Sequence, residues 1–273
     1  MKNNQKGALH FLYHTTLGRI ILKPLVSRPV SKLCGAFLSS RLSKPLIKGF
    51  VKGNNINLAD YKATNFKCFN DCFCREIKPE LRPIDMEKSH LISPCDGLLS
   101  AYKISNDTVL PIKQSSYTIK ALLGDDEIHK SYENGICLVF RLSVRHYHRY
   151  CFLDNLKIIK NRFLKGRLHT VRPVALERYP VFIQNCREYT VMQTENFGTV
   201  TQIEVGAMLV GKIQNHHTSG EFLKGEEKGM FLYGGSTIVV LLEKNAAELD
   251  PRYFENTEKG IETDVKMGEA LKI

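Results

Sequence analysis

The chain has 273 residues, 43% of them hydrophobic, and a formal net charge of +11. This length and composition are typical of a globular protein with one substantial core, or with one core and a small appendage. No apolar stretch approaches the ~20 residues that a bilayer-spanning helix needs, and no secretory signal peptide is apparent, so neither a membrane-spanning nor a secreted protein is expected.

Residues 1–53 carry nearly all of the excess positive charge. They contain ten of the 39 Lys and Arg residues and no Asp or Glu, whereas the other 29 basic residues are balanced by 28 acidic ones. Prolines at positions 24, 29 and 45 divide this segment into short helices. Such basic amphipathic helices suit either an anionic membrane interface or a helical layer packed on the main domain. No nucleic-acid partner is predicted, because no known binding motif or aromatic stacking pattern accompanies the charge.

Residues 54–82 are predicted to form a helix and a connector, and from residue 91 onward short β-rich runs alternate with turn residues. Strands are expected at 97–104, 108–112, 136–142, 150–154, 189–193, 200–213 and 236–242, with a short helix near 119–123. The sequence therefore predicts the α+β class, with a β-rich sheet or barrel-like core and an N-terminal layer of basic amphipathic helices.

The eight cysteines occur without a secretory signal, so free thiols in a reducing compartment are expected. Cys68, Cys72 and Cys74 form a Cys-x3-Cys-x-Cys cluster. No matching second pair follows, as a zinc ribbon would require. No metal site is therefore predicted.

The turn Gly234-Gly235-Ser236-Thr237 leads directly into an apolar run at 238–242. Two glycines give the backbone unusual freedom beside a hydroxyl nucleophile, so Ser236 could attack the carbonyl that precedes it. The ordinary interpretation of the same residues is a Gly-Gly turn that enters a core strand.

Three further segments hold groups that Ser236 could use, and one of them, Lys224 to Phe231, leads into the Gly-Gly-Ser-Thr turn and could be no more than a solvated hairpin. Ser93-Pro94-Cys95-Asp96-Gly97 places a carboxylate in a tight turn before a strand. Arg145-His146-Tyr147-His148-Arg149-Tyr150 brings two imidazoles to a strand edge, and imidazole is the side chain best suited to proton transfer near neutral pH. An Asp-Gly turn and a charged loop are the ordinary interpretations.

In their order and spacing, these segments resemble the phosphatidylserine decarboxylases from about residue 66 to the C-terminus. The matching pieces are Phe73-Cys74-Arg75-Glu76, Arg82-Pro83-Ile84, Ser93 to Gly97, Tyr147-His148-Arg149-Tyr150, Val205 to Ile213, Lys224 to Phe231, Gly235-Ser236-Thr237 and Ile261 to Glu269. So many ordered matches make coincidence improbable.

The resemblance implies that the chain cuts itself between Gly235 and Ser236, giving fragments 1–235 and 236–273. Ser236 would attack the Gly235 carbonyl, and the resulting ester would be converted to a pyruvoyl group at the new terminus. This pyruvoyl cofactor, derived from Ser236, would form a Schiff base with the amine of phosphatidylserine and take up the electrons released as CO2 leaves. The product would be phosphatidylethanolamine, and no metal would be required.

The resemblance also assigns Asp96 to orientation and charge stabilisation and Ser236 to nucleophilic attack. The family pattern Tyr-His-Arg-x-His has its second His as the base, and here that position is Cys151. The first His corresponds to His148, which the family associates with decarboxylation. His148 could serve both steps, Cys151 could act as a thiolate, or another imidazole could replace the missing one. Among other imidazoles, His169, in a strand-like stretch soon after the motif, is the preferred candidate, although it could equally be a satisfied core residue.

The expected organisation is a membrane-associating segment at 1–65 and a decarboxylase domain at 66–273. The enzyme is expected at the cytoplasmic face of the cell membrane, as a peripheral protein on anionic bilayers that contain phosphatidylserine. Its two fragments would form a heterodimer, and a homo-oligomer of such heterodimers stays open. The alternatives are a pyruvoyl-dependent decarboxylase of another amino-acid substrate and an uncleaved, non-enzymatic membrane-binding β domain.

Overall fold

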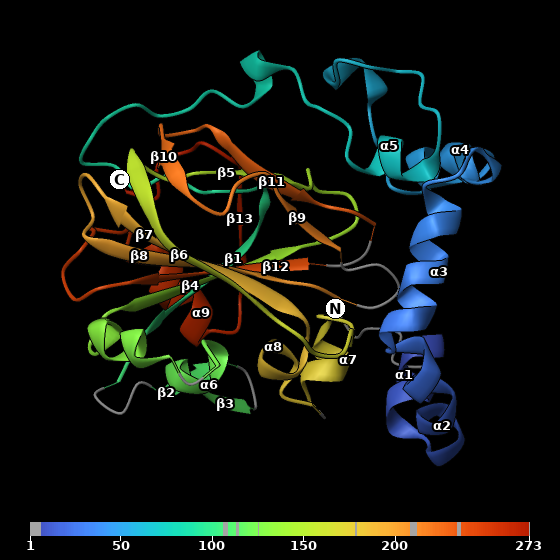
Figure 1. The fold of residues 1–273 in the computed structure, drawn as a ribbon, viewed down its shortest axis with the longest axis horizontal. Coiled ribbons are helices and arrows are strands. Elements are labelled where there is room, and N and C mark those ends of the chain that lie inside the picture. The colour runs from blue at the N-terminus through green and yellow to red at the C-terminus, as the bar shows by residue number, and fades with distance from the viewer. Residues whose placement is uncertain are drawn as a thin grey trace.

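The computed structural model of the chain describes residues 7–105, 109–112, 115–124, 126–177, 179–207, 212–233 and 236–272. Short helices form the N-terminal part, and Figure 1 shows the first three in blue along one side of the molecule. They are α1 (Ala8–His14), α2 (Thr16–Leu25), α3 (Arg28–Leu38), α4 (Leu46–Gly53) and α5 (Phe69–Phe73). None of the described helices is long and apolar enough to cross a bilayer.

The helix boundaries follow from local chemistry. Thr15 caps α2, since its hydroxyl accepts a hydrogen bond from the Gly18 N–H at 2.9 Å. Pro24 lies in the last turn of α2, and α3 begins with a proline at its first turn, where the missing N–H costs no hydrogen bond. The predicted division of this segment by prolines is therefore confirmed for α2 and α3.

An eight-stranded antiparallel sheet forms the centre of the molecule (Figure 1). Its strand order is β10 (Gly220–Phe222), β6 (Leu156–Leu164), β7 (Arg187–Thr194), β8 (Thr199–Val205), β12 (Ser236–Leu242), β4 (Ile136–Leu142), β1 (Gly97–Lys103) and β13 (Thr263–Val265). The sheet is open, with β10 and β13 at its edges, rather than closed into a barrel. The α+β class is confirmed.

The remaining elements are small. A three-stranded sheet has the order β5 (Arg149–Cys151), β11 (Glu227–Phe231) and β9 (Ile213–Asn215), and β2 (Val109–Ile112) pairs with β3 (Ser115–Thr118). The helices α6 (Ile119–Leu122), α7 (Pro173–Leu176), α8 (Val181–Gln184) and α9 (Arg252–Glu258) complete the chain. The strand expected at 200–213 is shorter, because β8 ends at Val205 and residues 208–211 lie outside the described part.

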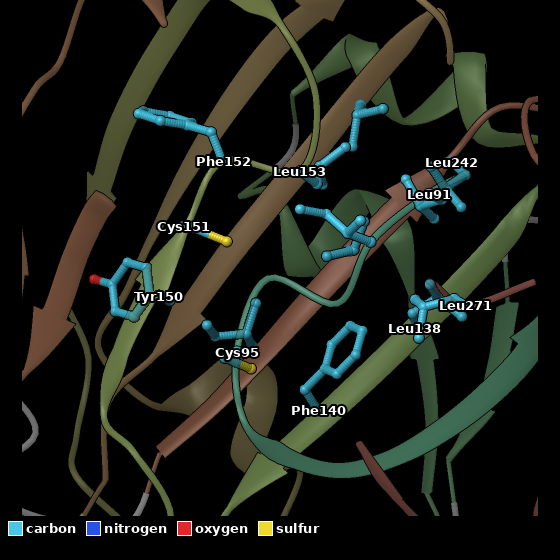
Figure 2. Close-up of a cluster of buried hydrophobic side chains, with 14 of the residues drawn as sticks. Leu91, Cys95, Leu138, Phe140, Tyr150, Cys151, Phe152, Leu153, Leu242 and Leu271 are labelled. Atoms are coloured by element: carbon cyan, nitrogen blue, oxygen red, sulfur yellow. The ribbon is translucent and has the colours of Figure 1, made fainter. Parts of the chain in front are cut away.

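Strand β12 is buried on both faces of the sheet. Val239 and Leu241 belong to the hydrophobic cluster that also contains Tyr13, Leu22 and Val26 of the N-terminal segment. Ile238, Val240 and Leu242 point into the opposite cluster, part of which Figure 2 shows around Phe140 and Leu138. Burial on both sides explains why this strand is a continuous apolar run rather than an alternating one.

A buried ion pair links the two larger sheets. The Lys228 ammonium on β11 donates to Glu204 Oε1 on β8 at 2.9 Å, and both side chains are completely buried. Asn215 on β9 accepts from the same ammonium at 3.1 Å and donates to Glu204 Oε2 at 3.1 Å. Each charge is therefore paired and hydrogen-bonded, the condition under which charges are tolerated in a core.

Candidate active site

Ser236 is the first residue of β12 and pairs with Leu142, the last residue of β4. Its side chain is buried, with 1% of the residue exposed, and its Oγ has no hydrogen-bond partner among the described residues. Gly234 and Gly235 lie outside the described part of the chain. A buried hydroxyl without a partner is destabilising, so this position needs an explanation.

Asp96 lies at the same end of the sheet, immediately before β1. Leu98 of β1 pairs with Arg141 of β4, and Leu142 of β4 pairs with Ser236. Strand β4 therefore lies between Asp96 and Ser236, and two strand spacings correspond to about 10 Å. The Arg82 guanidinium binds the Asp96 carboxylate with two hydrogen bonds, at 2.7 Å to Oδ1 and 2.5 Å to Oδ2. The Met267 N–H donates to Oδ1 at 3.0 Å. These contacts hold a charged carboxylate in one orientation.

Two chain connections join the eight-stranded sheet to the three-stranded sheet, and they lie beside one another where they leave each sheet. One follows β4 and leads into β5, and the other follows β11 and leads into β12. Ser236 pairs with Leu142 at one end, and Met230 pairs with Arg149 at the other. The two connections therefore start and end beside one another, and the Phe73 ring contacts both, with centroids 4.1 Å from His148 and 5.2 Å from Tyr233.

His148 lies at the end of the first connection and is fully buried. Its Nδ1 is 2.9 Å from the His146 carbonyl oxygen, which can only accept, so Nδ1 carries the hydrogen and Nε2 keeps a free lone pair. Nε2 has no partner among the described residues. Burial, with a smaller effect of the Arg75 guanidinium, lowers the pKa of His148 to about 3, which keeps the imidazole neutral.

His146 has the opposite arrangement. Its Nδ1 accepts a hydrogen bond from the Ser143 N–H at 3.1 Å, so in the neutral ring Nε2 carries the hydrogen. Burial lowers the pKa of His146. Of these two neighbouring imidazoles, only His148 therefore offers a free lone pair.

Cys151 belongs to the hydrophobic cluster in Figure 2, together with Cys95 and Phe140. Only 1% of the residue is exposed, and its backbone N–H donates to the Pro94 carbonyl at 2.9 Å. Burial raises the pKa of the Cys151 thiol to about 12. The thiol is therefore protonated near neutral pH and behaves as a small apolar core residue.

His169 lies in a different place, at the contact between the N-terminal helices and the core. Its Nδ1 is 3.3 Å from the Tyr13 hydroxyl, and its ring stacks on Tyr179 with 4.5 Å between centroids. Among the residues that the structure describes, no hydrogen bond, ion pair or ring contact joins His169 to Ser236, Asp96 or His148. The register thus places Ser236 and Asp96 at one end of the sheet and His148 at the end of the connection that leaves it, whereas His169 lies elsewhere.

A cavity of about 530 Å³ opens beside the segment that leads to Ser236. Its lining residues are Arg28, Ser31, Lys32, Gly35, Ala36 and Ser39 of the α3 segment, together with Phe163, Leu168, Cys186, Lys212, Ile213 and Leu232. Sequence reasoning missed this cavity. The only signal was the one-turn spacing of Arg28 and Lys32, which places both cations on one face of a helix.

The cysteine cluster contributes packing rather than ligands. Cys72 and Cys74 are buried, Cys74 Sγ lies 3.3 Å from the Phe231 carbonyl oxygen, and burial raises the pKa of Cys74 to about 12. Within the described ranges, no three His, Cys, Asp or Glu side chains gather as a metal site.

The sequence of the chain matches a known protein family. Residues 69–272 match the family model described as phosphatidylserine decarboxylase. The chain is 45% identical over 271 residues to phosphatidylserine decarboxylase proenzyme 2 of Clostridium acetobutylicum, covering 99% of this chain and 93% of that protein. It is 41% identical over 269 residues to the phosphatidylserine decarboxylase proenzyme of Ruminiclostridium cellulolyticum, covering 96% and 90%. The proenzyme of Clostridium botulinum (strain 657 / Type Ba4) is 40% identical over 270 residues, with 96% and 91% covered. The chain therefore belongs to the phosphatidylserine decarboxylase family of enzymes.

Proposed function

We propose that this chain cuts itself at Gly235–Ser236, converts Ser236 to a pyruvoyl group and uses that group to decarboxylate phosphatidylserine to phosphatidylethanolamine. The observation that carries the proposal is the buried Ser236 hydroxyl, which has no partner among the described residues and shares one end of the sheet with Asp96, while His148 ends the connection that starts at Leu142, the residue paired with Ser236. Strands β4 and β8 pair with β12 on both sides and fix its backbone. A fixed nucleophile beside its target carbonyl needs little further ordering to react.

We assign the general base of self-cleavage to His148. The Ser236 hydroxyl would lose its proton to His148 Nε2 as Oγ bonds to the Gly235 carbonyl carbon, and the leaving Ser236 nitrogen would take a proton as the peptide bond breaks, leaving an ester. Cys151 is a weak candidate because its thiol pKa is about 12. His169 is weak for a different reason: Tyr13 occupies its Nδ1, and its Nε2 carries the hydrogen, as shown below.

Asp96 is the proposed positioning and charge-stabilising carboxylate. The bidentate contact with Arg82 fixes both of its oxygens, so the negative charge keeps one place during the reaction. The Arg82 guanidinium and the Met267 N–H therefore support the site without touching the reacting bond.

The residues around Ser236 fit a pyruvoyl group. The group is about as large as the serine from which it forms, and the Ser236 position is buried with no side-chain hydrogen bond among the described residues that the conversion would break. Once formed, it supplies a carbonyl that reacts with the substrate amine and accepts the electrons released with CO2.

The cavity beside Leu232 is the proposed binding place of the phospholipid. Its walls include apolar residues such as Phe163 and Leu168, which suit acyl chains, and its cations Arg28, Lys32 and Lys212 suit the phosphate. Helix α3, which forms one wall, belongs to the segment proposed to meet the bilayer.

We further propose that residues 1–65 attach the enzyme to the cytoplasmic face of an anionic membrane, beside the decarboxylase domain at 66–273. Large apolar side chains of these helices face solvent, including Leu17 at 60%, Ile20 at 58% and Leu33 at 73% exposure. Ten Lys and Arg residues and no acidic residue accompany them in the first 53 positions. This combination is that of a helix layer lying in an anionic interface.

The test has two stages. Denaturing electrophoresis with intact mass analysis is expected to show residues 1–235 and a pyruvoyl-headed 236–273, and only the intact chain in Ser236→Ala. Phosphatidylserine liposomes are then expected to release CO2 when mixed with the cleaved protein and not when mixed with the uncut Ser236→Ala chain. An intact chain with a free Ser236 hydroxyl would support the non-enzymatic membrane-binding domain. Cleavage without CO2 release would indicate another amine substrate.

A further inference from the structure

A second cavity, of about 260 Å³, lies where α2 meets the core. Its lining residues are Thr16, Arg19, Ile20, Leu22, Lys23, Val26, Arg167, His169 and Tyr179. None of them lines the larger cavity beside Leu232, and none belongs to the proposed catalytic group. The proposed function therefore leaves this site without a role.

Three cations surround the cavity. Arg19 and Lys23 lie one turn apart on the same face of α2, and Arg167 comes from the segment after β6. Among the described residues, none of their charged groups has a hydrogen bond or an ion pair. The nearby carboxylate of Glu177 lies 3.7 Å from His14 instead. The cavity is thus rimmed by positive charge that no described carboxylate neutralises.

The hydrogen bonds of Tyr13 decide which nitrogen of His169 carries the hydrogen. The Thr170 N–H donates to the Tyr13 oxygen at 3.0 Å, and among the described residues His169 Nδ1, at 3.3 Å, is the one acceptor that the Tyr13 hydroxyl reaches, so the hydroxyl donates to Nδ1. Nδ1 is then an acceptor, and Nε2 carries the hydrogen of the neutral ring. Burial and the Arg167 charge lower the pKa of His169 to about 4, so the ring is neutral at physiological pH.

The Nε2–H group of His169 is a buried donor without an acceptor. The residue is 2% exposed, and Nε2 has no partner in the described part of the chain. Nδ1 faces Tyr13 and one ring face is covered by Tyr179, so Nε2 is the polar atom that the ring can present to the cavity. A donor of this kind together with three cations fits an anion with several acceptor oxygens.

We propose that this cavity binds the phosphate group of an anionic phospholipid in the bilayer, at a site separate from the one that holds the substrate. A lipid source is favoured over free phosphate because Ile20, Leu22 and Val26 form an apolar wall beside the cations, and Ile20 and Leu17 are exposed on the same helix. The inference rests on the proposed membrane attachment of residues 1–65, and it is independent of self-cleavage.

The test uses the full chain and vesicles of phosphatidylcholine with phosphatidylglycerol, which lack the serine headgroup. His169→Phe changes no charge near neutral pH, so surface electrostatics alone would leave vesicle binding unchanged. We expect His169→Phe to bind these vesicles about 10-fold more weakly than wild type, which is the usual effect of losing a hydrogen bond to a charged group. Tyr13→Phe removes the hydroxyl that fixes the tautomer but keeps an imidazole that can donate from Nε2 to a bound anion, and it is expected to bind within about 3-fold of wild type.

A matched pair of double variants separates this site from general attraction. Arg19→Gln with Lys23→Gln and Arg41→Gln with Lys48→Gln each remove two charges from the N-terminal segment, but only the first pair lines the cavity. The first is expected to weaken binding about 10-fold more than the second. If His169→Phe loses its native circular dichroism, this comparison decides.

Equal losses in the two double variants, or unchanged binding of a folded His169→Phe, would overturn the site. A His169-dependent rise in melting temperature with inorganic phosphate, but no His169 dependence with vesicles, would assign the site to free phosphate and reject the lipid. If the wild-type chain does not bind these vesicles, the membrane attachment fails and this site fails with it. Decarboxylation of detergent-dispersed phosphatidylserine would still test the proposed activity separately.

Discussion

The Phe231 N–H donates a hydrogen bond to the His148 carbonyl oxygen at 2.9 Å. Phe231 ends β11, five positions before Ser236 in the chain, and His148 is the residue before β5. This contact ties the backbone of the proposed base to the segment that ends at the proposed cut. Movement of either one would therefore displace the other.

His148→Gln is expected to slow the appearance of the 236–273 fragment by about 100-fold or more, the usual contribution of a general base. The reason is that His148 Nε2 has a free lone pair and no partner among the described residues. Timed electrophoresis of freshly synthesised chain measures the rate. His146→Gln is the matched control, since its Nε2 carries a hydrogen, and it should be cut at close to the wild-type rate. Equal slowing by both variants would contradict the assignment.

Cys151→Ala is expected to leave the cleavage rate within about 3-fold of wild type, because a buried thiol with a pKa of about 12 contributes packing and not a base. The cost should appear in stability instead, at ~1 kcal/mol. Electrophoresis and urea unfolding measure the two effects on the same preparation. An uncut Cys151→Ala chain that is folded would restore the thiolate hypothesis.

Arg82→Lys is expected to slow cleavage by about 10-fold, since an ammonium cannot hold both Asp96 oxygens as the guanidinium does. Asp96→Asn should slow it at least as much, because the charge itself is lost. Arg252→Lys weakens a more exposed pair, in which the guanidinium contacts one oxygen of Asp250, and serves as the control. A cleavage rate equal to that of the control would remove Asp96 positioning from the mechanism.

Lys228→Met is expected to lower the free energy of unfolding by ~3–5 kcal/mol, because it leaves the Glu204 carboxylate buried without its partner. Burial already raises the pKa of Glu204. The double variant Lys228→Met with Glu204→Gln should recover most of this loss. Lys157→Met is the control, as it breaks an exposed pair with Glu221, worth ~1 kcal/mol or less. Urea unfolding in an uncleaved Ser236→Ala chain gives all three values.

Acid is expected to destabilise the fold through its neutral histidines. His148 has a folded pKa of about 3 and His169 one of about 4, whereas an unfolded histidine titrates near 6.5. Between about pH 6.5 and 4 the unfolded chain binds more protons, so each residue lowers stability by ~1.4 kcal/mol per pH unit as the pH falls. Above pH 7 neither His148 nor His169 changes the unfolding free energy with pH.

The same Ser236→Ala background tests this titration. Adding His148→Gln should reduce the slope of unfolding free energy against pH by about one proton, whatever its effect on absolute stability. His217→Gln removes an exposed imidazole and is the control. A slope that is the same in both variants would mean that His148 is protonated in the folded chain.

The central strands were predictable because their sequences have one dominant cause. β12 is apolar from Ile238 to Leu242 since both of its faces are buried, and most of β4 and β1 is apolar for the same reason. β6 was missed. Its sequence carries Lys157, Lys160 and Arg162, and its alternation breaks at the register shift between Ile158 and Lys160.

Within the site, the sequence indicated Ser236 and Asp96 by their turns, and the register of β1, β4 and β12 brings both to one end of the sheet. The roles of the histidines could not be read in this way. They depend on which polar group faces each ring: a backbone carbonyl at His148, a backbone N–H at His146 and the Tyr13 hydroxyl at His169. The first two contacts depend on the local turn of the backbone and the third joins residues far apart in the sequence, and residue type alone encodes neither.

Strand β12 lies between β8 and β4, both of which precede residue 235. A break immediately before Ser236 would leave the smaller fragment held in the middle of a sheet built by the larger one. Two fragments synthesised apart would have to open a finished sheet to admit its central strand. Under the proposed cleavage, the uncut chain would build the sheet first, and both fragments would take their shape from it.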